Sequence, residues 1–195
     1  VKNVTLIKGT MPANYGGRLS SVIDVQMKEG NSKQFEMEGG IGLISSRLTL
    51  QAPMQRKKYA DRNRKGSILV SGRRTYIFDI AQPALKRTDF AGTNYFFYDL
   101  NVKANYQFSD KDRLYVSGYY GKDVFVYNSA KNNTNVKIPW GNATATIRYN
   151  HLFSDKLFMN MSFIFNDYQF SFTGEQLDFG FKANSGVRDY NVKVD

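Results

Sequence analysis

Cysteine is absent from the 195 residues, so the chain has neither a disulfide framework nor a thiolate metal site. Histidine occurs once, at His151, and no His, Asp and Glu cluster has the spacing of metal ligands. A single histidine beside a predicted turn does not indicate a catalytic pair of nucleophile and base. The glycine-rich stretch 39–43 also lacks the lysine and the helix of a phosphate-binding loop. We therefore expect no enzymatic activity and no cofactor.

Long hydrophobic runs are also missing, since none approaches the roughly 18 residues that a membrane-spanning helix requires. The mean hydropathy is −0.47, yet the chain has 15 Phe and 13 Tyr. This combination is typical of a membrane β-barrel, whose strands are apolar only at alternate residues. A water-soluble β-sandwich fits the same totals, so composition leaves both open.

Acidic residues are few: 17 Asp and Glu stand against 27 Lys and Arg, which gives a formal net charge of +10. A nucleic-acid partner would require basic residues gathered on one face or helix. Here they are scattered, apart from a run at 55–65, so we expect no nucleic-acid partner. A solvated basic surface and contact with anionic lipid headgroups both remain open.

Strict alternation of apolar and polar residues predicts strands with one face in an apolar medium. It is clearest at 95–108 and recurs at 141–153 and 157–165. The apolar parity of these segments includes Leu100, Val102, Ala104, Ile147, Met161 and Phe163. The opposite parity includes Asp99, Asn101, Lys103, Thr144, Thr146 and Arg148. A phase change near Asn166 predicts either a bulge or emergence from the apolar layer.

Weaker alternation predicts further strands at 66–78, 113–127 and 187–195. Within 34–52 the phase reverses, which predicts two strands joined by a tight turn, with Gly40 and Gly42 supplying the required backbone angles. A single long bulged strand is the alternative. The fold class expected is all-β, with about eight antiparallel strands of a larger transmembrane barrel.

The connections carry a second pattern. The near-copies FSDKD (108–112) and FSDK (153–156) predict short turns, whereas 79–94, 128–137 and 173–186 predict long loops. Short turns on one side and long loops on the other are typical of outer-membrane barrels. With the Ser-Asp turns on the periplasmic side, the chain reaches its first barrel strand from that side. Aromatics near strand ends, such as Trp140 and Phe170, fit girdles at the two membrane interfaces.

The first thirty residues, VKNVTLIKGTMPANYGGRLSSVIDVQMKEG, hold two short apolar alternations around a loop of small residues. They resemble the C-terminal end of the plug domain of TonB-dependent outer-membrane receptors, most closely the Bacteroidota type with a carboxypeptidase-regulatory-like N-terminal domain. The stretch GSILVSGRRTYIFDI (66–80) adds to the resemblance. The positions that carry it in the plug are Leu6, Ile7, Lys8, Gly9, Pro12, Ala13, Tyr15, Gly16, Gly17, Arg18, Val22, Ile23, Asp24, Val25 and Lys28. The family's Gly-Gly pair before the last plug strand is replaced by Ser20-Ser21.

The resemblance implies that 1–31 end a plug domain and that 32–195 begin a barrel of about 22 strands. Both ends of the chain look cut, so we expect a fragment that lacks the TonB box. The implied function is import of a scarce or bulky nutrient across the bacterial outer membrane. The implied partners are the TonB–ExbB–ExbD complex, outer-membrane lipids, a siderophore, oligosaccharide or peptide substrate, and in some members a surface lipoprotein.

The resemblance also implies which residues contact the barrel wall from the plug: Lys8, Gly9, Pro12, Tyr15, Gly16, Gly17, Arg18, Ser20 and Ser21. The glycines would allow close approach and positive φ, and Lys8 and Arg18 would pair with Asp99 or Asp123. Asp99, Asn101, Lys103, Thr144, Thr146 and Arg148 would face the lumen. A passive porin would have no plug-like stretch. A soluble β-sandwich that binds carbohydrate or serves in adhesion is the alternative function.

Overall fold

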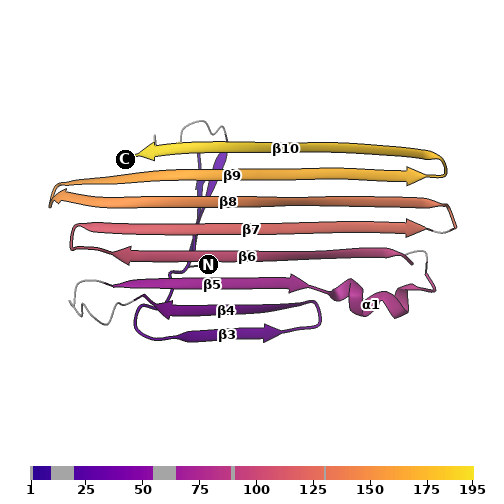
Figure 1. The fold of residues 1–195 in the computed structure, drawn as a ribbon, viewed down its shortest axis with the longest axis horizontal. Coiled ribbons are helices and arrows are strands. Elements are labelled where there is room, and N and C mark those ends of the chain that lie inside the picture. Colours follow the sequence, from indigo (N-terminus) through magenta and orange to yellow (C-terminus); the bar gives the residue numbers. More distant parts are fainter. Residues whose placement is uncertain (1, 10–19, 55–64, 89–90, 130) are drawn as a thin grey trace.

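The computed structural model describes residues 2–9, 20–54, 65–88, 91–129 and 131–195. Its main body is an eight-stranded antiparallel sheet in which each strand lies beside its neighbour in sequence (Figure 1). A separate two-stranded hairpin precedes it. The elements are β1 (Asn3–Lys8), β2 (Ser21–Gln26), β3 (Glu36–Ile41), β4 (Ser45–Pro53), β5 (Gly66–Thr75), α1 (Ile77–Leu85), β6 (Thr93–Gln107), β7 (Asp112–Ser129), β8 (Thr134–Ser154), β9 (Leu157–Gln176) and β10 (Phe179–Val194).

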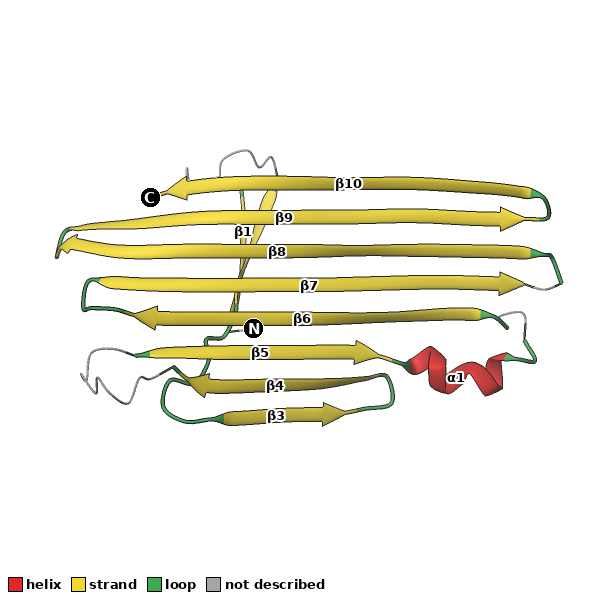
Figure 2. Cartoon of the chain, in the orientation of Figure 1, coloured by secondary structure: helices red, strands yellow, loops and turns green. Residues whose placement is uncertain are grey.

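The prediction of an all-β chain with eight consecutive antiparallel sheet strands is confirmed, and Figure 2 shows how little of the chain is helical. The sheet is open in the described residues, with β3 at one edge and β10 at the other. β7 to β10 are long, from 16 to 21 residues. Each pairs with the next over nearly its full length, so the backbone donors and acceptors of the meander are largely satisfied within the sheet.

Residues 34–52 form two strands, as the phase reversal predicts. β3 and β4 are joined by a tight turn in which the Gly42 amide donates to the Ser45 carbonyl at 3.0 Å. The expected use of glycine angles there is wrong, because neither Gly40 nor Gly42 has a positive φ. Among the described glycines only Gly9 (φ 83°) and Gly92 (φ 81°) do.

A helix replaces the end of the predicted strand 66–78 and the start of the predicted loop 79–94. β5 stops at Thr75 and α1 follows at once. The Tyr76 hydroxyl donates to the Gly42 carbonyl at 2.5 Å, and the Gln82 amide donates to the Thr93 carbonyl at 2.8 Å. These bonds fix both ends of the helical connection to the end of the sheet.

The two other predicted long loops are wrong. Pairing of β7 with β8 continues to Ser129 and Thr134, and pairing of β9 with β10 continues to Gln176 and Phe179. Leu177, at φ 55°, lies in the short turn between the last pair. Short turns therefore occur at both ends of the sheet, and the loop asymmetry that favoured a barrel does not hold.

The two Ser-Asp turns lie at the same end of the sheet, where β3 also begins (Figure 1). The prediction that the chain enters its first sheet strand at the end where the Ser-Asp turns lie is therefore confirmed. No bulge occurs at Asn166, which pairs with Thr144 and Asp189 without a register shift. The irregularity in β8 and β9 lies instead between Leu152 and Ser154, beside the second Ser-Asp turn.

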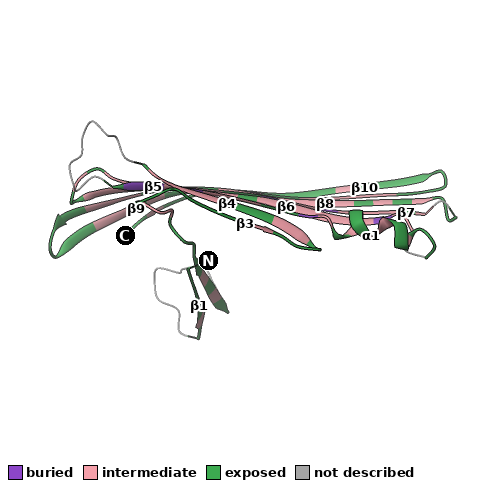
Figure 3. Ribbon diagram, turned by 90° about the horizontal axis from the view of Figure 1, so that it is seen from below, coloured by how far each residue is buried: buried purple, intermediate pink, exposed green. Residues whose placement is uncertain are grey.

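The sheet has little core of its own. Leu69 and Val124 are the only buried hydrophobic residues in the part of the chain that the structure describes. Leu100, Ile147 and Phe163 are 45%, 49% and 44% exposed, and no second layer covers them (Figure 3). No described helix is long and apolar enough to cross a membrane. The sheet thus presents a broad apolar face without a partner from the described chain.

Candidate functional site

Two adjacent rows of the sheet differ in polarity from one edge to the other. One row of cross-strand partners, from β3 to β10, is Glu38, Thr49, Ser71, Asn101, Tyr119, Thr144, Asn166 and Asp189. The next row is Met37, Leu50, Val70, Val102, Gly118, Ala145, Phe165 and Tyr190. Because neighbouring residues of a strand point to opposite faces, these two rows lie on opposite faces, one mainly polar and the other mainly apolar across the eight strands.

The residues predicted to face a lumen lie together on the polar face. Asp99, Asn101 and Lys103 share it by alternation along β6, and pairing through β7 joins them to the β8 residues. Thr144 and Thr146 stand in the rows of Asn101 and Lys103, and Arg148 follows at the same parity. The alternation thus identified a common face correctly.

The apolar face forms a band of limited width. On β9 it extends from Leu157 to Phe165, and on β6 from Tyr98 to Tyr106, with one further apolar residue, Phe96, beyond Tyr98. Nine residues of strand span about 27–30 Å, and a tilted strand needs about 9–11 residues to cross the hydrocarbon layer. The band stops at a charged pair on β9 and β10, Asp167 and Arg188, whose side chains are 3.2 Å apart. The width matches a bilayer.

Aromatic rings lie at both borders of this band. At one border the ring centroids of Tyr98 and Tyr120 are 6.1 Å apart. At the other border those of Tyr106 and Phe108 are 5.0 Å apart. The predicted girdle members Trp140 and Phe170 do not belong to either border, because they lie on the polar face. There Trp140 stacks on Tyr95 with a centroid distance of 6.1 Å.

The linker after β2 contacts the polar face, and the hairpin projects from the sheet beyond it (Figure 3). Lys103 donates to the Met27 carbonyl at 3.2 Å, and its ammonium is 3.9 Å from Glu29. Arg113 contacts the same carboxylate at 3.4 Å and also donates to Asn105 at 3.1 Å. We call Met27, Glu29 and Gly30, with Lys103 and Arg113, the linker anchor. It holds the chain between hairpin and sheet to the wall.

Close backbone packing completes the linker anchor. A Cβ placed on Gly30 would lie 2.5 Å from the Ile68 carbonyl oxygen, so only glycine fits there. Leu69 is 8% exposed although it stands on the polar face. Next to it, Asn105 donates to Ser67 at 2.7 Å, and both side chains are buried. This is the most enclosed region of the described sheet.

No protein-family model, curated protein or solved structure matches this chain.

No hydrogen bond or ion pair joins the described plug residues Lys8, Gly9, Ser20 and Ser21 to the sheet. β1 and β2 form the expected hairpin, with Lys8 opposite Ser21, and Gly9 has the expected positive φ but makes no close approach. The predicted ion pair of Lys8 is wrong: Asp99 pairs with Arg73 at 2.8 Å, and Asp123 accepts a hydrogen bond from Tyr95 at 2.6 Å. Ser20 is exposed. Pro12, Tyr15, Gly16, Gly17 and Arg18 lie outside the described residues.

His151 belongs to a polar cluster at the border of the apolar band. The Asp112 carboxylate accepts hydrogen bonds from the hydroxyls of Ser109 (2.5 Å) and Tyr149, and lies 2.6 Å from Nδ1 of His151. These bonds, with that from Ser109 the largest contributor, lower the pKa of Asp112 well below its usual range. The cluster ties the first Ser-Asp turn to β8.

Replacing Asp112 with Asn should loosen that turn. The charge-assisted bonds are lost, so amide exchange at 109–112 should accelerate relative to wild type, as measured by hydrogen exchange and mass spectrometry. Since folding lowers the carboxyl pKa, the difference should be complete at pH 7 and persist below pH 4, where a free Asp begins to protonate. Asp155→Asn, in the second turn, is the control. Equal exchange in wild type and D112N at pH 7 would show that the cluster does not hold the turn.

Proposed function

We propose that this chain is the plug end and the first wall strands of a TonB-dependent transporter of the bacterial outer membrane. One observation carries the proposal: a mainly polar row lies beside a mainly apolar row across eight strands, and the linker after β2 is anchored on the polar side. In a barrel, the apolar side contacts lipid and the polar side lines a wet interior. A preceding segment on the polar side is then a plug inside the barrel.

The open edges of the sheet support a larger barrel. β3 and β10 each have one side without a strand partner in the described chain, and unpaired backbone groups cannot face hydrocarbon. Further strands must therefore pair with these edges in the membrane. Outer-membrane transporters with about 22 strands have a plugged lumen, which agrees with an anchored N-terminal segment.

A plugged barrel requires energy to open, because the plug must move or deform before a bulky substrate passes. The resemblance of the first thirty residues to TonB-dependent plugs supplies the source: the TonB–ExbB–ExbD complex of the inner membrane. Siderophores, oligosaccharides and peptides are the substrate classes of that family. The soluble β-sandwich is not favoured, since no described part of the chain covers the apolar face.

Uptake in cells tests this function. A strain without the gene should lose growth on one member of a panel of ferric siderophores, oligosaccharides and peptides supplied as the limiting nutrient. A strain without tonB should lose growth on the same nutrient, and the intact gene should restore it only where tonB is present. Restoration without tonB would indicate a passive pore. Recovery of the full-length protein in the soluble fraction would indicate a sandwich.

A further inference from the structure

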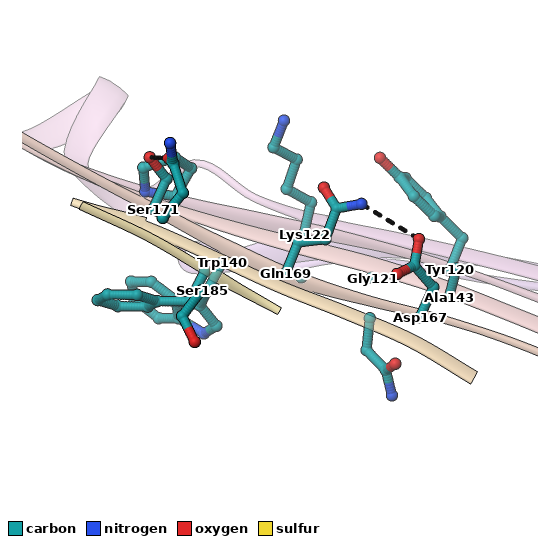
Figure 4. Close-up of a pocket in the computed structure, with 14 residues that line it drawn as sticks. Tyr120, Gly121, Lys122, Trp140, Ala143, Asp167, Gln169, Ser171 and Ser185 are labelled. Carbon is teal, nitrogen blue, oxygen red and sulfur yellow. Dashed lines mark hydrogen bonds between the residues drawn. The ribbon is translucent and has the colours of Figure 1, made fainter. Parts of the chain in front are cut away.

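A hollow of about 480 Å³ lies on the apolar side of the sheet, just beyond the border of the band that is distant from the Ser-Asp turns. Figure 4 shows Lys122, Gln169 and Ser171 on one side of the strands, and Trp140 and Ser185 on the other. The residues from the opposite face line the hollow through their backbone, because each lies between two residues that point into it.

The register explains the shape of the hollow. One row across β7 to β10 is Lys122, Gly141, Gln169 and Gly186, and the row nearer the band is Tyr120, Ala143, Asp167 and Arg188. Gly141 and Ala143 leave β8 almost without side chains at this point. β7 and β9 then form two walls that carry Tyr120 and Lys122 on one side and Asp167 and Gln169 on the other.

The charges of the hollow leave one cation without a counterion. Arg188 is balanced by Asp167, which also accepts a hydrogen bond from Gln169 at 3.1 Å. Lys122 makes no ion pair with any residue that the structure describes. Gln169, Ser171 and Asn184 add neutral hydrogen-bonding groups; Ser171 donates to Asn184 at 2.7 Å, and each group keeps further capacity for sugar hydroxyls. The hollow is therefore suited to an anionic, hydroxyl-rich group.

The position of the hollow beside the apolar band also indicates what kind of ligand fits. In the next row toward the band the apolar face carries Val102, Ala145 and Phe165, so a molecule seated in the hollow can place hydrocarbon chains on the band. We propose that the hollow binds the phosphorylated sugar headgroup of an outer-leaflet glycolipid, with its phosphate on Lys122 and its acyl chains on the band. The inference rests on the proposed function and on the expected orientation, with the Ser-Asp turns on the periplasmic side and the hollow therefore at the outer surface.

Native mass spectrometry of the full-length protein, extracted from its own outer membrane in mild detergent, tests the proposal. Wild type should retain glycolipid. Lys122→Glu reverses the unpaired charge and Ala143→Phe fills the hollow, and each should lower the retained glycolipid by about tenfold. Lys156→Glu makes the same charge change at the opposite end of the sheet and should retain the wild-type amount. Equal retention by wild type and K122E would overturn the proposal.

A second arm separates a lipid from a free anion. Inorganic phosphate in excess should not displace the glycolipid from the wild-type protein, because phosphate has no chains to bury on the band. Displacement, or K122-dependent phosphate binding by protein that carries no glycolipid, would assign the hollow to soluble anions instead. Failure here is distinct from failure of the proposed function: a protein that inserts in the outer membrane and needs tonB for uptake, yet retains no glycolipid, contradicts only this inference.

Discussion

Replacing Val102 with arginine should block assembly of the full-length protein in the outer membrane. Val102 lies midway between the border residues Tyr98 and Tyr106, in the row that is mainly apolar across the eight strands. A charged side chain on the lipid face near the bilayer midplane costs about 2–4 kcal/mol. We expect at least a tenfold decrease in protein recovered from the outer membrane in heat-modifiable form, the electrophoretic signature of a folded barrel.

Asn101→Arg is the matched control, because the position is one residue away and on the polar face. The new guanidinium would stand near Asp99, which already accepts hydrogen bonds from Asn101 and Arg73. Its assembly should therefore remain close to that of wild type. Equal assembly of the two variants would mean that the apolar row does not contact lipid, and the membrane proposal would fail with it.

The strands and their faces could be predicted because alternation is enforced wherever one face is apolar. Beyond the band this constraint disappears, since both faces contact polar surroundings. Residues 128–137 and 173–186 have no clear alternation and were predicted as loops, yet most of them pair in long ladders. Their order comes from backbone hydrogen bonds, which the pattern of side chains does not report.

The helix α1 was missed for a related reason. The apolar residues Ile77, Phe78 and Ile80 follow β5 directly, so they read as the end of a strand and the start of a loop. The contacts that fix the helix join Tyr76 to Gly42, 34 residues away, and Gln82 to Thr93 at the start of β6. Local pattern carries no information about such partners.

In the candidate site, too, the local pattern predicts the faces of the strands but not the contacts between distant residues. The polar face followed from parity, but the linker anchor joins Glu29 to Arg113, 84 residues away, and Met27 to Lys103, 76 residues away. The hollow needed the register, because it arises where Gly141 and Ala143 of β8 lie between larger side chains of β7 and β9. The sequence predicted Lys8 and Arg18 as partners of Asp99 or Asp123, whereas Asp99 pairs with Arg73, its cross-strand neighbour on β5.

Gly30 provides the strongest test of how the N-terminal segment is attached. Gly30→Val would place a branched side chain 2.5 Å from the Ile68 carbonyl oxygen and 2.7 Å from its carbon. These are backbone atoms of β5, which is paired on both sides, so no rotamer change relieves the contact. Overpacking of this kind costs about 1–3 kcal/mol. The linker should therefore lift from the sheet and break its contacts with Lys103 and Arg113.

The expected result is faster amide exchange across β2 and residues 27–30 in the full-length protein, while β6 to β9 keep wild-type protection. Gly39→Val is the matched control: Gly39 is exposed, and a Cβ there meets nothing closer than 3.7 Å. Glu29→Gln removes only the ion pairs with partly exposed Lys103 and Arg113, so it should produce a smaller acceleration. Exchange in G30V equal to that in G39V would show that the linker is not held by this packing. A graded order, G39V below E29Q below G30V, would establish that close backbone contact, more than charge, fastens the N-terminal segment to the wall it precedes.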